Sequence, residues 1–200
     1  MNLNNYYYIF QNSISKEFCD KVITLGESQI TDLGTVEDKD ENKDVTIKSI
    51  RDSNVAWLED KFIYDELAPY IRTANKEAGW NFQYDYFQSC QFTIYKENQF
   101  YDWHCDAYKN PYMSPNENYN GKIRKLSCTL LLNSPKDFEG GEFQMDYRNA
   151  LTGSQIVTVD KLNNIGSLVV FPSHVWHRVK PVLKGVRYSL VIWILGYPFK

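Results

Sequence analysis

The sequence predicts a mainly β protein of the α+β class, in which N-terminal helices support an antiparallel sandwich or barrel. Apolar residues recur at helical spacing within residues 13–79. From Phe82 onward, short alternating segments rich in aromatic and β-branched residues are separated by turn-rich stretches such as NSPKDFEGG. The aromatic content of 16%, with 15 Tyr and 11 Phe, also favours half-buried strands.

The helical part contains two predicted helices. Ser15 is a suitable N-cap for the segment KEFCDKVITLGES, and Gly26 is the expected end of that helix. A second helix is expected over residues 57–78, and Gly79 should terminate it. The polar, charge-dense residues 31–48 between them predict an exposed loop.

The second part of the chain predicts a sheet. The expected strands are, in order, YDYFQSCQFTIY, KLSCTLLLN, GEFQMDY, GSLVVF, HRVKPV and RYSLVIWIL. The longest turn-rich connection is AYKNPYMSPNENYNG, residues 107–121, and a loop of this length is usually a functional lid or a disordered segment. A length of 200 residues fits one domain over residues 1–200, with helical support over about 13–79 and a β core over about 82–197.

Charge and composition narrow the function classes. The net charge is −3 and the pI is about 5.7, and this acidic balance argues against a nucleic-acid partner. The sequence has neither a membrane-length apolar run nor a secretory start, so we expect a cytoplasmic protein without a membrane partner. The four cysteines form no CxxC pair and match no zinc pattern, so we expect them to be reduced.

Two of the three histidines stand out by their surroundings. His104 precedes Asp106 by two residues in FYDWHCDAY, so in a strand the imidazole and the carboxylate face the same side. By itself His-x-Asp is a short pattern that a hydrogen-bonded strand histidine also explains. Together with a distant second histidine, however, it forms the two-His, one-carboxylate triad of non-haem Fe(II) oxygenases. This triad leaves open positions on the metal for an oxoacid and O₂.

The distant histidine is expected to be His177. It opens a short strand, and Arg187 follows ten residues later on the next strand, where a guanidinium can pair bidentately with a carboxylate. Ser189 and Trp193 share the strand face of Arg187 and should line the same pocket. His174 lies in a Pro-Ser turn, where an exposed position is the simpler interpretation.

These residues resemble the motif of the 2-oxoglutarate/Fe(II)-dependent dioxygenase superfamily, within it the prolyl 4-hydroxylase-like branch. The matching positions are Tyr95, His104, Asp106, His177, Arg187 and Trp193, each at the family's spacing. The segment LSCTLLLNSPKDFEGGEFQM resembles the family's central strand and hairpin, and RDSNVAWL resembles the segment before its support helix. The likeness covers about residues 50–196.

The resemblance implies a double-stranded β-helix (jelly-roll) core braced by N-terminal helices. It implies Fe(II) held by His104, Asp106 and His177, and 2-oxoglutarate held by Arg187 with help from Tyr95. Thr129 lies on the strand face that the match turns inward and can add a hydrogen bond, although it can equally be a simple strand former. Ascorbate is the expected reductant of stray Fe(III).

The resemblance also implies a substrate, a prolyl residue in a peptide or protein that lies across the lid at 107–121. A basic residue after the lid should contact this substrate, and Lys122, Arg124 and Lys125 are equal candidates. Three alternatives stay open. They are the same chemistry on a free amino acid or small molecule, demethylation of nucleic acid, and a non-catalytic jelly-roll binding protein of cupin or lectin type.

Overall fold

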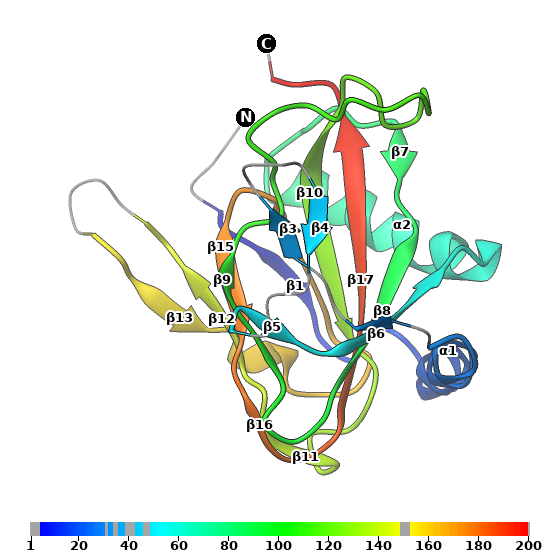
Figure 1. Cartoon of the computed structure of the whole chain (residues 1–200), viewed down its shortest axis with the longest axis vertical. Helices are drawn as coiled ribbons and strands as arrows, with labels where there is room; N and C mark the ends of the chain where they lie inside the picture. The colour runs from blue at the N-terminus through cyan, green and yellow to red at the C-terminus, as the bar shows by residue number, and fades with distance from the viewer. Residues whose placement is uncertain are drawn as a thin grey trace.

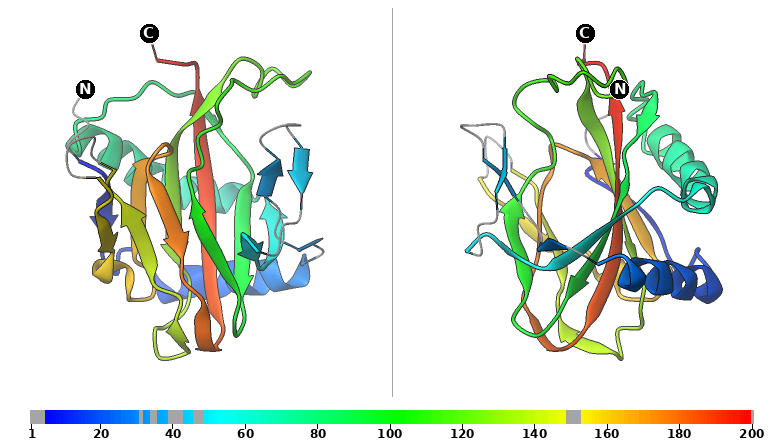
Figure 2. Two further views of the ribbon diagram at one scale, coloured as in Figure 1. Left: turned by 60° about the vertical axis from the view of Figure 1, so that its left-hand side comes forward. Right: turned by 45° about the vertical axis from the view of Figure 1, so that its right-hand side comes forward.

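The computed structural model of the chain describes residues 5–30, 32–33, 36–38, 43–45, 49–148 and 153–199, and leaves the side chains within 31–48 undescribed. Two antiparallel sheets face each other, with two helices on the outer side of the larger one (Figures 1 and 2). This arrangement confirms the predicted α+β class and its jelly-roll core.

The larger sheet has eight strands in the order β1-β14-β10-β17-β8-β6-β2, with β7 paired to β17. Its strands are β1 (Tyr8–Phe10), β2 (Asp32–Leu33), β6 (Asn54–Leu58), β7 (Tyr86–Phe87), β8 (Cys90–Tyr95), β10 (Ile123–Leu131), β14 (Leu168–Pro172) and β17 (Arg187–Gly196). The smaller sheet has five strands in the order β13-β12-β15-β9-β5. They are β5 (Arg51–Asp52), β9 (Phe100–His104), β12 (Phe143–Asp146), β13 (Ile156–Thr158) and β15 (Trp176–Val179).

Two further strand pairs and one short 3-10 turn lie outside the two sheets. Strand β3 (Val36–Asp38) pairs with β4 (Lys43–Val45), and β11 (Phe138–Gly140) pairs with β16 (Val182–Gly185). The 3-10 turn η1 covers Asp160–Leu162. The expectation of a continuous loop over 31–48 is therefore wrong where β2, β3 and β4 form, and its remaining residues lie outside the described part of the chain.

Helix α1 (Lys16–Ser28) begins as the sequence predicts, because the Ser15 hydroxyl accepts a hydrogen bond from the Phe18 N–H at 3.1 Å. Its predicted end at Gly26 is wrong. Gly26 lies inside the helix, where an added Cβ would come within 2.3 Å of the Phe92 ring on β8. The glycine therefore serves the close approach of α1 to the sheet and does not stop the helix.

Helix α2 (Lys61–Glu77) begins four residues later than predicted. Residues 54–58 form β6, which pairs with β8 and so becomes part of the larger sheet. This long-range pairing outweighs the helical spacing of the local sequence. The end of α2 is as expected, since Gly79 follows the C-cap residue Ala78 with a φ of +74°.

Strand alternation divides the interior into two apolar clusters. On β17, Leu190, Ile192 and Ile194 face the helices and pack with Phe92 and Ile71. The second cluster lies between the sheets and includes Leu131, Met145, Val169 and Phe171. Residues of the opposite β17 face, from Arg187 onward, therefore also point between the sheets.

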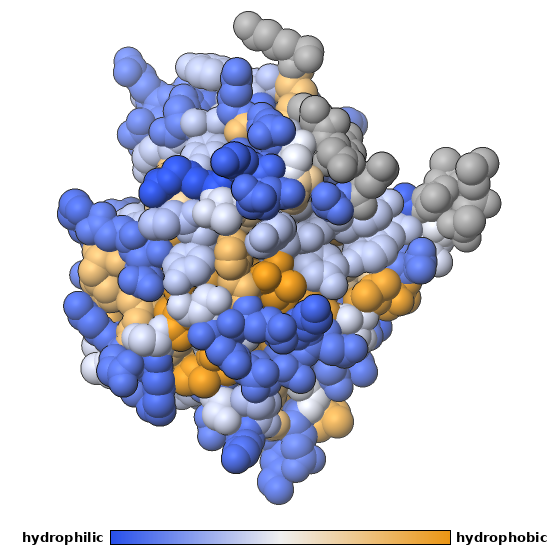
Figure 3. Space-filling model, turned by 180° about the vertical axis from the view of Figure 1, so that it is seen from behind, coloured by the Kyte–Doolittle hydropathy of each residue, from blue (hydrophilic) through white to orange (hydrophobic). Residues whose placement is uncertain are grey.

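The outer surface shows only small apolar patches between polar side chains when the molecule is viewed from behind (Figure 3). None of the four cysteines forms a disulfide in the structure. Among the described residues, no helix is long and apolar enough to cross a membrane. The cytoplasmic location stays a prediction of the sequence.

Candidate metal centre and its pocket

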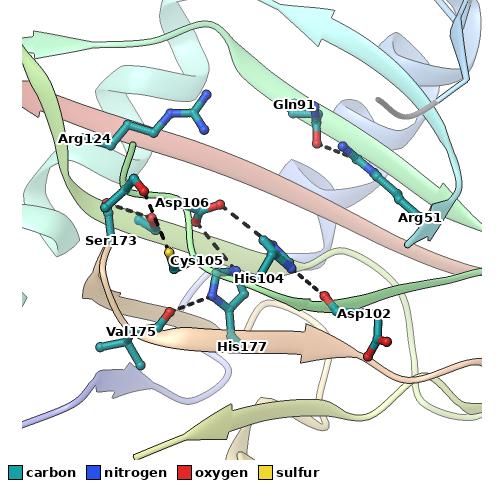
Figure 4. A network of polar contacts seen from close by, with 12 residues as sticks. Arg51, Gln91, Asp102, His104, Cys105, Asp106, Arg124, Ser173, Val175 and His177 are labelled. Carbon is teal, nitrogen blue, oxygen red and sulfur yellow. Dashed lines mark hydrogen bonds and ion pairs between the residues drawn. The ribbon is translucent and has the colours of Figure 1, made fainter. Parts of the chain in front are cut away.

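The two histidines expected to bind iron lie side by side in the smaller sheet. His177 on β15 is paired with His104 on β9, and Asp106 follows β9 by two residues. The Ser173 carbonyl fixes this corner by accepting hydrogen bonds at 2.9 Å from the N–H groups of Asp106 and Ala107. Nε2 of His104 lies 3.8 Å and Nε2 of His177 3.6 Å from the Asp106 carboxylate, and the three side chains converge in Figure 4.

Backbone carbonyls orient both imidazole rings. Nδ1 of His104 lies 2.7 Å from the Asp102 carbonyl, and Nδ1 of His177 lies 3.0 Å from the Val175 carbonyl. Because a carbonyl can only accept, each Nδ1 carries the proton and each Nε2 presents its lone pair to the centre. Such support of the outer nitrogen is typical of histidines that bind metals.

The charge state of the triad suits a cation. Burial and the neighbouring His177 lower the pKa of His104 to about 3, so its ring is neutral. Burial by itself would raise the pKa of Asp106, but His177, His104 and Arg124 outweigh it and hold the pKa below its usual range. Asp106 Oδ2 is buried and has no hydrogen-bond partner among the described residues. A buried carboxylate in this state is costly unless a cation or a donor satisfies it, and a metal ion fits.

Arg187 supplies a positive charge in the same interior. It begins β17 directly opposite Tyr95 on β8, and only 2% of its surface is exposed. Its Nη1 has no hydrogen-bond partner, and it forms no ion pair with a carboxylate in the described part of the chain. The positive φ of Gly141 and its missing side chain make room, since an added Cβ would lie 2.9 Å from Arg187 Cδ.

The other expected cofactor contacts lie on the same inner face. Thr129 is paired with Val191, and Ser189 with Thr93, and all of these strands belong to the larger sheet. Trp193 is buried, and its indole Nε1 has no hydrogen-bond partner in the part of the chain that the structure describes. The exposed His174 lies outside this group, as expected.

Sequence reasoning missed several residues of the pocket. Thr93 is buried, and within the described ranges its hydroxyl has no hydrogen-bond partner. The alternation of QFTIY already placed it on the face of Tyr95. Arg51 lies over the Tyr101 ring at 4.6 Å and donates to Gln91 Oε1 at 2.7 Å (Figure 4). No sequence spacing links Arg51 to Gln91, because only the approach of β5 to β8 brings them together.

The structure separates the three basic candidates after the lid. Lys122 forms an ion pair with Asp85 at 2.9 Å, and the Lys125 ammonium lies 4.0 Å from the Phe199 ring centre. Arg124 instead lies 3.9 Å above the Trp193 ring and helps to lower the pKa of Asp106. Of the three basic residues, it is therefore Arg124 that acts on the triad electrostatically, and Figure 4 draws it above Asp106.

The loop 107–121 is better anchored than its polar composition predicts. Tyr108 and Tyr112 pack edge to face at 4.8 Å, and Tyr112 packs in the same way on Tyr119 at 5.5 Å. The Gly121 N–H donates to the Tyr112 carbonyl, and the Tyr112 N–H donates to the Lys122 carbonyl, both at 2.9 Å. Tyrosine packing thus replaces the apolar side chains that the sequence lacks here.

Comparison with known proteins places this geometry in a family. A sequence model described as the 2OG-Fe(II) oxygenase superfamily matches residues 90–195. A PKHD-type hydroxylase of Xylella fastidiosa is 32% identical over 105 residues, which are 52% of this chain and 43% of the relative. A PKHD-type hydroxylase of Colwellia psychrerythraea is 42% identical over 69 residues, which are 34% of this chain and 28% of the relative. The matches therefore span less than half of these relatives.

Solved structures share the fold. A Pseudomonas putida prolyl-4-hydroxylase superposes with a TM-score of 0.64 at 20% identity, covering 96% of this chain and 92% of the other. A Trichoplax adhaerens prolyl hydroxylase, in complex with a hypoxia inducible factor peptide fragment, has a TM-score of 0.64 at 21% identity and covers 96% and 84%. The family model covers more than half of the chain, and the protein thus belongs to the 2OG-Fe(II) oxygenase superfamily.

Proposed function

We propose that the protein hydroxylates a prolyl residue of a peptide or protein, consuming 2-oxoglutarate and O₂ and releasing succinate and CO₂. In this proposal His104, Asp106 and His177 hold Fe(II), and Arg187 holds the distal carboxylate of 2-oxoglutarate. The observation that carries it is the presence of two buried charged groups in one interior: a carboxylate beside two imidazole Nε2 atoms, and a guanidinium whose Nη1 has no acceptor in the described part of the chain.

The pocket supplies binding groups of the correct charge for 2-oxoglutarate. Arg187 offers a planar pair of donors to a carboxylate in a site from which water is largely excluded. Tyr95, directly opposite, can donate its hydroxyl to the same carboxylate; burial raises its pKa, so it stays protonated. The hydroxyls of Thr129 and Ser189 are the further donors expected near it.

Bound iron and 2-oxoglutarate supply the oxidising power, so that one O₂ atom enters succinate and the other converts a substrate C–H bond to C–OH. The protein's part is to orient the reactants and to keep water out. The Phe171 and Phe143 rings lie 4.7 and 5.5 Å from the His177 ring and shield that side of the centre. We also expect ascorbate to sustain turnover by reducing Fe(III) formed in idle cycles.

The proposal of a peptide substrate is based on the residues at the mouth of the pocket. There, Arg124 donates a hydrogen bond from its Nε to Gln88 Oε1 at 2.7 Å. Its remaining N–H groups can donate to a peptide carbonyl. The ring centres of Trp193 and Tyr108 lie 3.9 and 4.8 Å from this guanidinium. One structural relative is described as bound to a peptide fragment, which supports the same class of substrate for this chain.

The test is an aerobic assay with Fe(II), 2-oxoglutarate, ascorbate and a panel of prolyl peptides, free proline and a methylated oligonucleotide. We expect succinate release to rise with a peptide, and mass spectrometry to find one added oxygen on its prolyl residue. If product forms only from free proline, or only from the oligonucleotide, that class of molecule is the substrate and the peptide is not. Absence of succinate under all conditions would leave a binding protein.

A further inference from the structure

An exposed tryptophan stands beside the pocket without an assigned role. Trp57 on β6 is directly paired with Gln91 on β8, whose side chain points inward to Arg51. Because directly paired residues share one face of a sheet, Trp57 is also on the inner face. Yet 44% of its surface is exposed, whereas Val55, two residues earlier on the same face, is 3% exposed.

Trp57 continues an aromatic row that begins inside the pocket. Its ring centre lies 6.0 Å from that of Trp193 on β17, and Arg124 covers Trp193 at 3.9 Å. The strands that carry the two tryptophans lie in the same sheet with β8 between them (Figure 1). The row therefore runs from the buried centre outward to solvent.

The buried indole N–H of Trp193 is a second, independent indication that a ligand contacts these two tryptophans. Trp193 is 6% exposed, and its indole N–H has no acceptor among the described residues. A buried donor of this kind is costly unless a ligand or water satisfies it. The carbonyl of an extended peptide crossing the row would satisfy it while side chains contact the rings.

The spacing of the rings fits an extended chain. Side chains at positions i and i+2 of an extended peptide point to the same side and lie about 6.6 Å apart, close to the 6.0 Å between the two indole centres. A peptide that places one residue against Trp193 thus places the residue two positions away against Trp57. Large exposed aromatic side chains are also the residues that most often anchor a partner.

We propose that Trp57 forms a second subsite that selects a ring-bearing residue, proline or aromatic, two positions from the residue that is hydroxylated. This inference rests on the proposed peptide substrate and names a feature of it. A prolyl or aromatic ring packs flat on an indole and brings little side-chain freedom to lose. An alanine at that position leaves Trp57 exposed.

The experiment compares peptides with one reactive proline and with either a ring-bearing residue or alanine two positions before or after it. For the wild-type protein we expect kcat/KM to be about tenfold higher for the ring-bearing peptide of one direction. In Trp57→Ala this preference should fall to near one. Trp57→Phe should retain part of it, because a ring remains, and circular dichroism establishes that both variants are folded.

Phe199→Ala is the matched control, since Phe199 is 46% exposed but packs on Phe82 and Lys125. It should keep the wild-type preference. Hydroxylation without any ring preference in the wild-type protein overturns the subsite and leaves the proposed function intact. An equal loss of preference in Phe199→Ala also overturns it. Failure of every peptide, with product from another substrate class, removes both proposals.

Discussion

At the scale of single residues, the pocket is distinguished by buried charged groups whose atoms lack hydrogen-bond partners in the described part of the chain. Among the described residues, Asp106 Oδ2 and Arg187 Nη1 are both buried without a hydrogen-bond partner. Each is costly in the protein alone, and each is complementary to a group that the family uses. Substitutions at these positions and their neighbours therefore separate metal binding from oxoacid binding.

His177→Ala should abolish binding of Fe(II), because it removes one of two imidazoles whose Nε2 faces the carboxylate. Losing even an outer partner of a metal ligand lowers affinity by about 10–100-fold, so loss of a ligand should exceed this. Anaerobic Fe(II) titration measures the effect. His174→Ala is the control, since His174 is exposed nearby on the same segment. Equal losses in the two variants would contradict the assignment.

Arg187→Ala should raise the Michaelis constant for 2-oxoglutarate by two to three orders of magnitude while Fe(II) still binds. Breaking a buried charge pair costs about 3–5 kcal/mol, and each 1.4 kcal/mol is about a factor of ten. Tyr95→Phe loses only a hydrogen bond to a charged group, about 1.5–3 kcal/mol, and should have a smaller effect in the same direction. An unchanged constant in Arg187→Ala would place the oxoacid elsewhere.

Helix α1 packs closely on strand β8 at Gly26. Replacing an exposed glycine in a helix with alanine ordinarily raises the free energy of unfolding by about 0.5–1 kcal/mol. Gly26→Ala should have the opposite sign, because its Cβ would come within 2.3 Å of the Phe92 ring. We expect a loss of about 1–3 kcal/mol in the free energy of unfolding, measured by urea denaturation. Glu17→Ala, at an exposed position of α1, should change it by less than about 0.5 kcal/mol.

The loop 107–121 is the second element with a testable role. Its tyrosines pack on one another and place Tyr108 over Arg124 at 4.8 Å. Replacing residues 109–119 with a short Gly-Ser linker should abolish peptide hydroxylation, since the mouth of the pocket loses this wall. Slow conversion of 2-oxoglutarate to succinate without peptide should persist. Coupled hydroxylation by the shortened protein would show that the loop does not hold the substrate.

The whole molecule should be stabilised by its cofactors, because they bind the folded state only. At about 100 times its dissociation constant a ligand adds about 2.7 kcal/mol, or about 5–10 °C in Tm for a chain of this size. Anaerobic thermal denaturation should show one increment with Fe(II) and a second with 2-oxoglutarate. Arg187→Ala should keep the first and lose the second, and a retained second increment would argue against the proposed carboxylate contact.

Much of the site was accessible from sequence because its residues are related by spacing along single strands. The two-residue period predicts that His104 and Asp106 face the same side, although Asp106 lies just beyond the end of β9, and it puts Arg187 on the same face as Ser189 and Trp193 before any strand pairing is known. Turn signals likewise separated the strands of the core, and the cap at Ser15 located the start of α1. These features depend on local geometry, which the sequence by itself determined.

The tertiary structure alone decided which strands and helices become neighbours. Pairing with β8 turns residues 54–58 into a strand. Packing also places Arg124, one of three nearby basic residues, on Trp193, and it brings Arg51 within hydrogen-bond distance of Gln91. It also placed Trp57 6.0 Å from Trp193, although 136 positions separate them in the chain. Such contacts follow from long-range pairing and packing, whose energies depend on the partner segment and leave no periodic pattern in the local sequence.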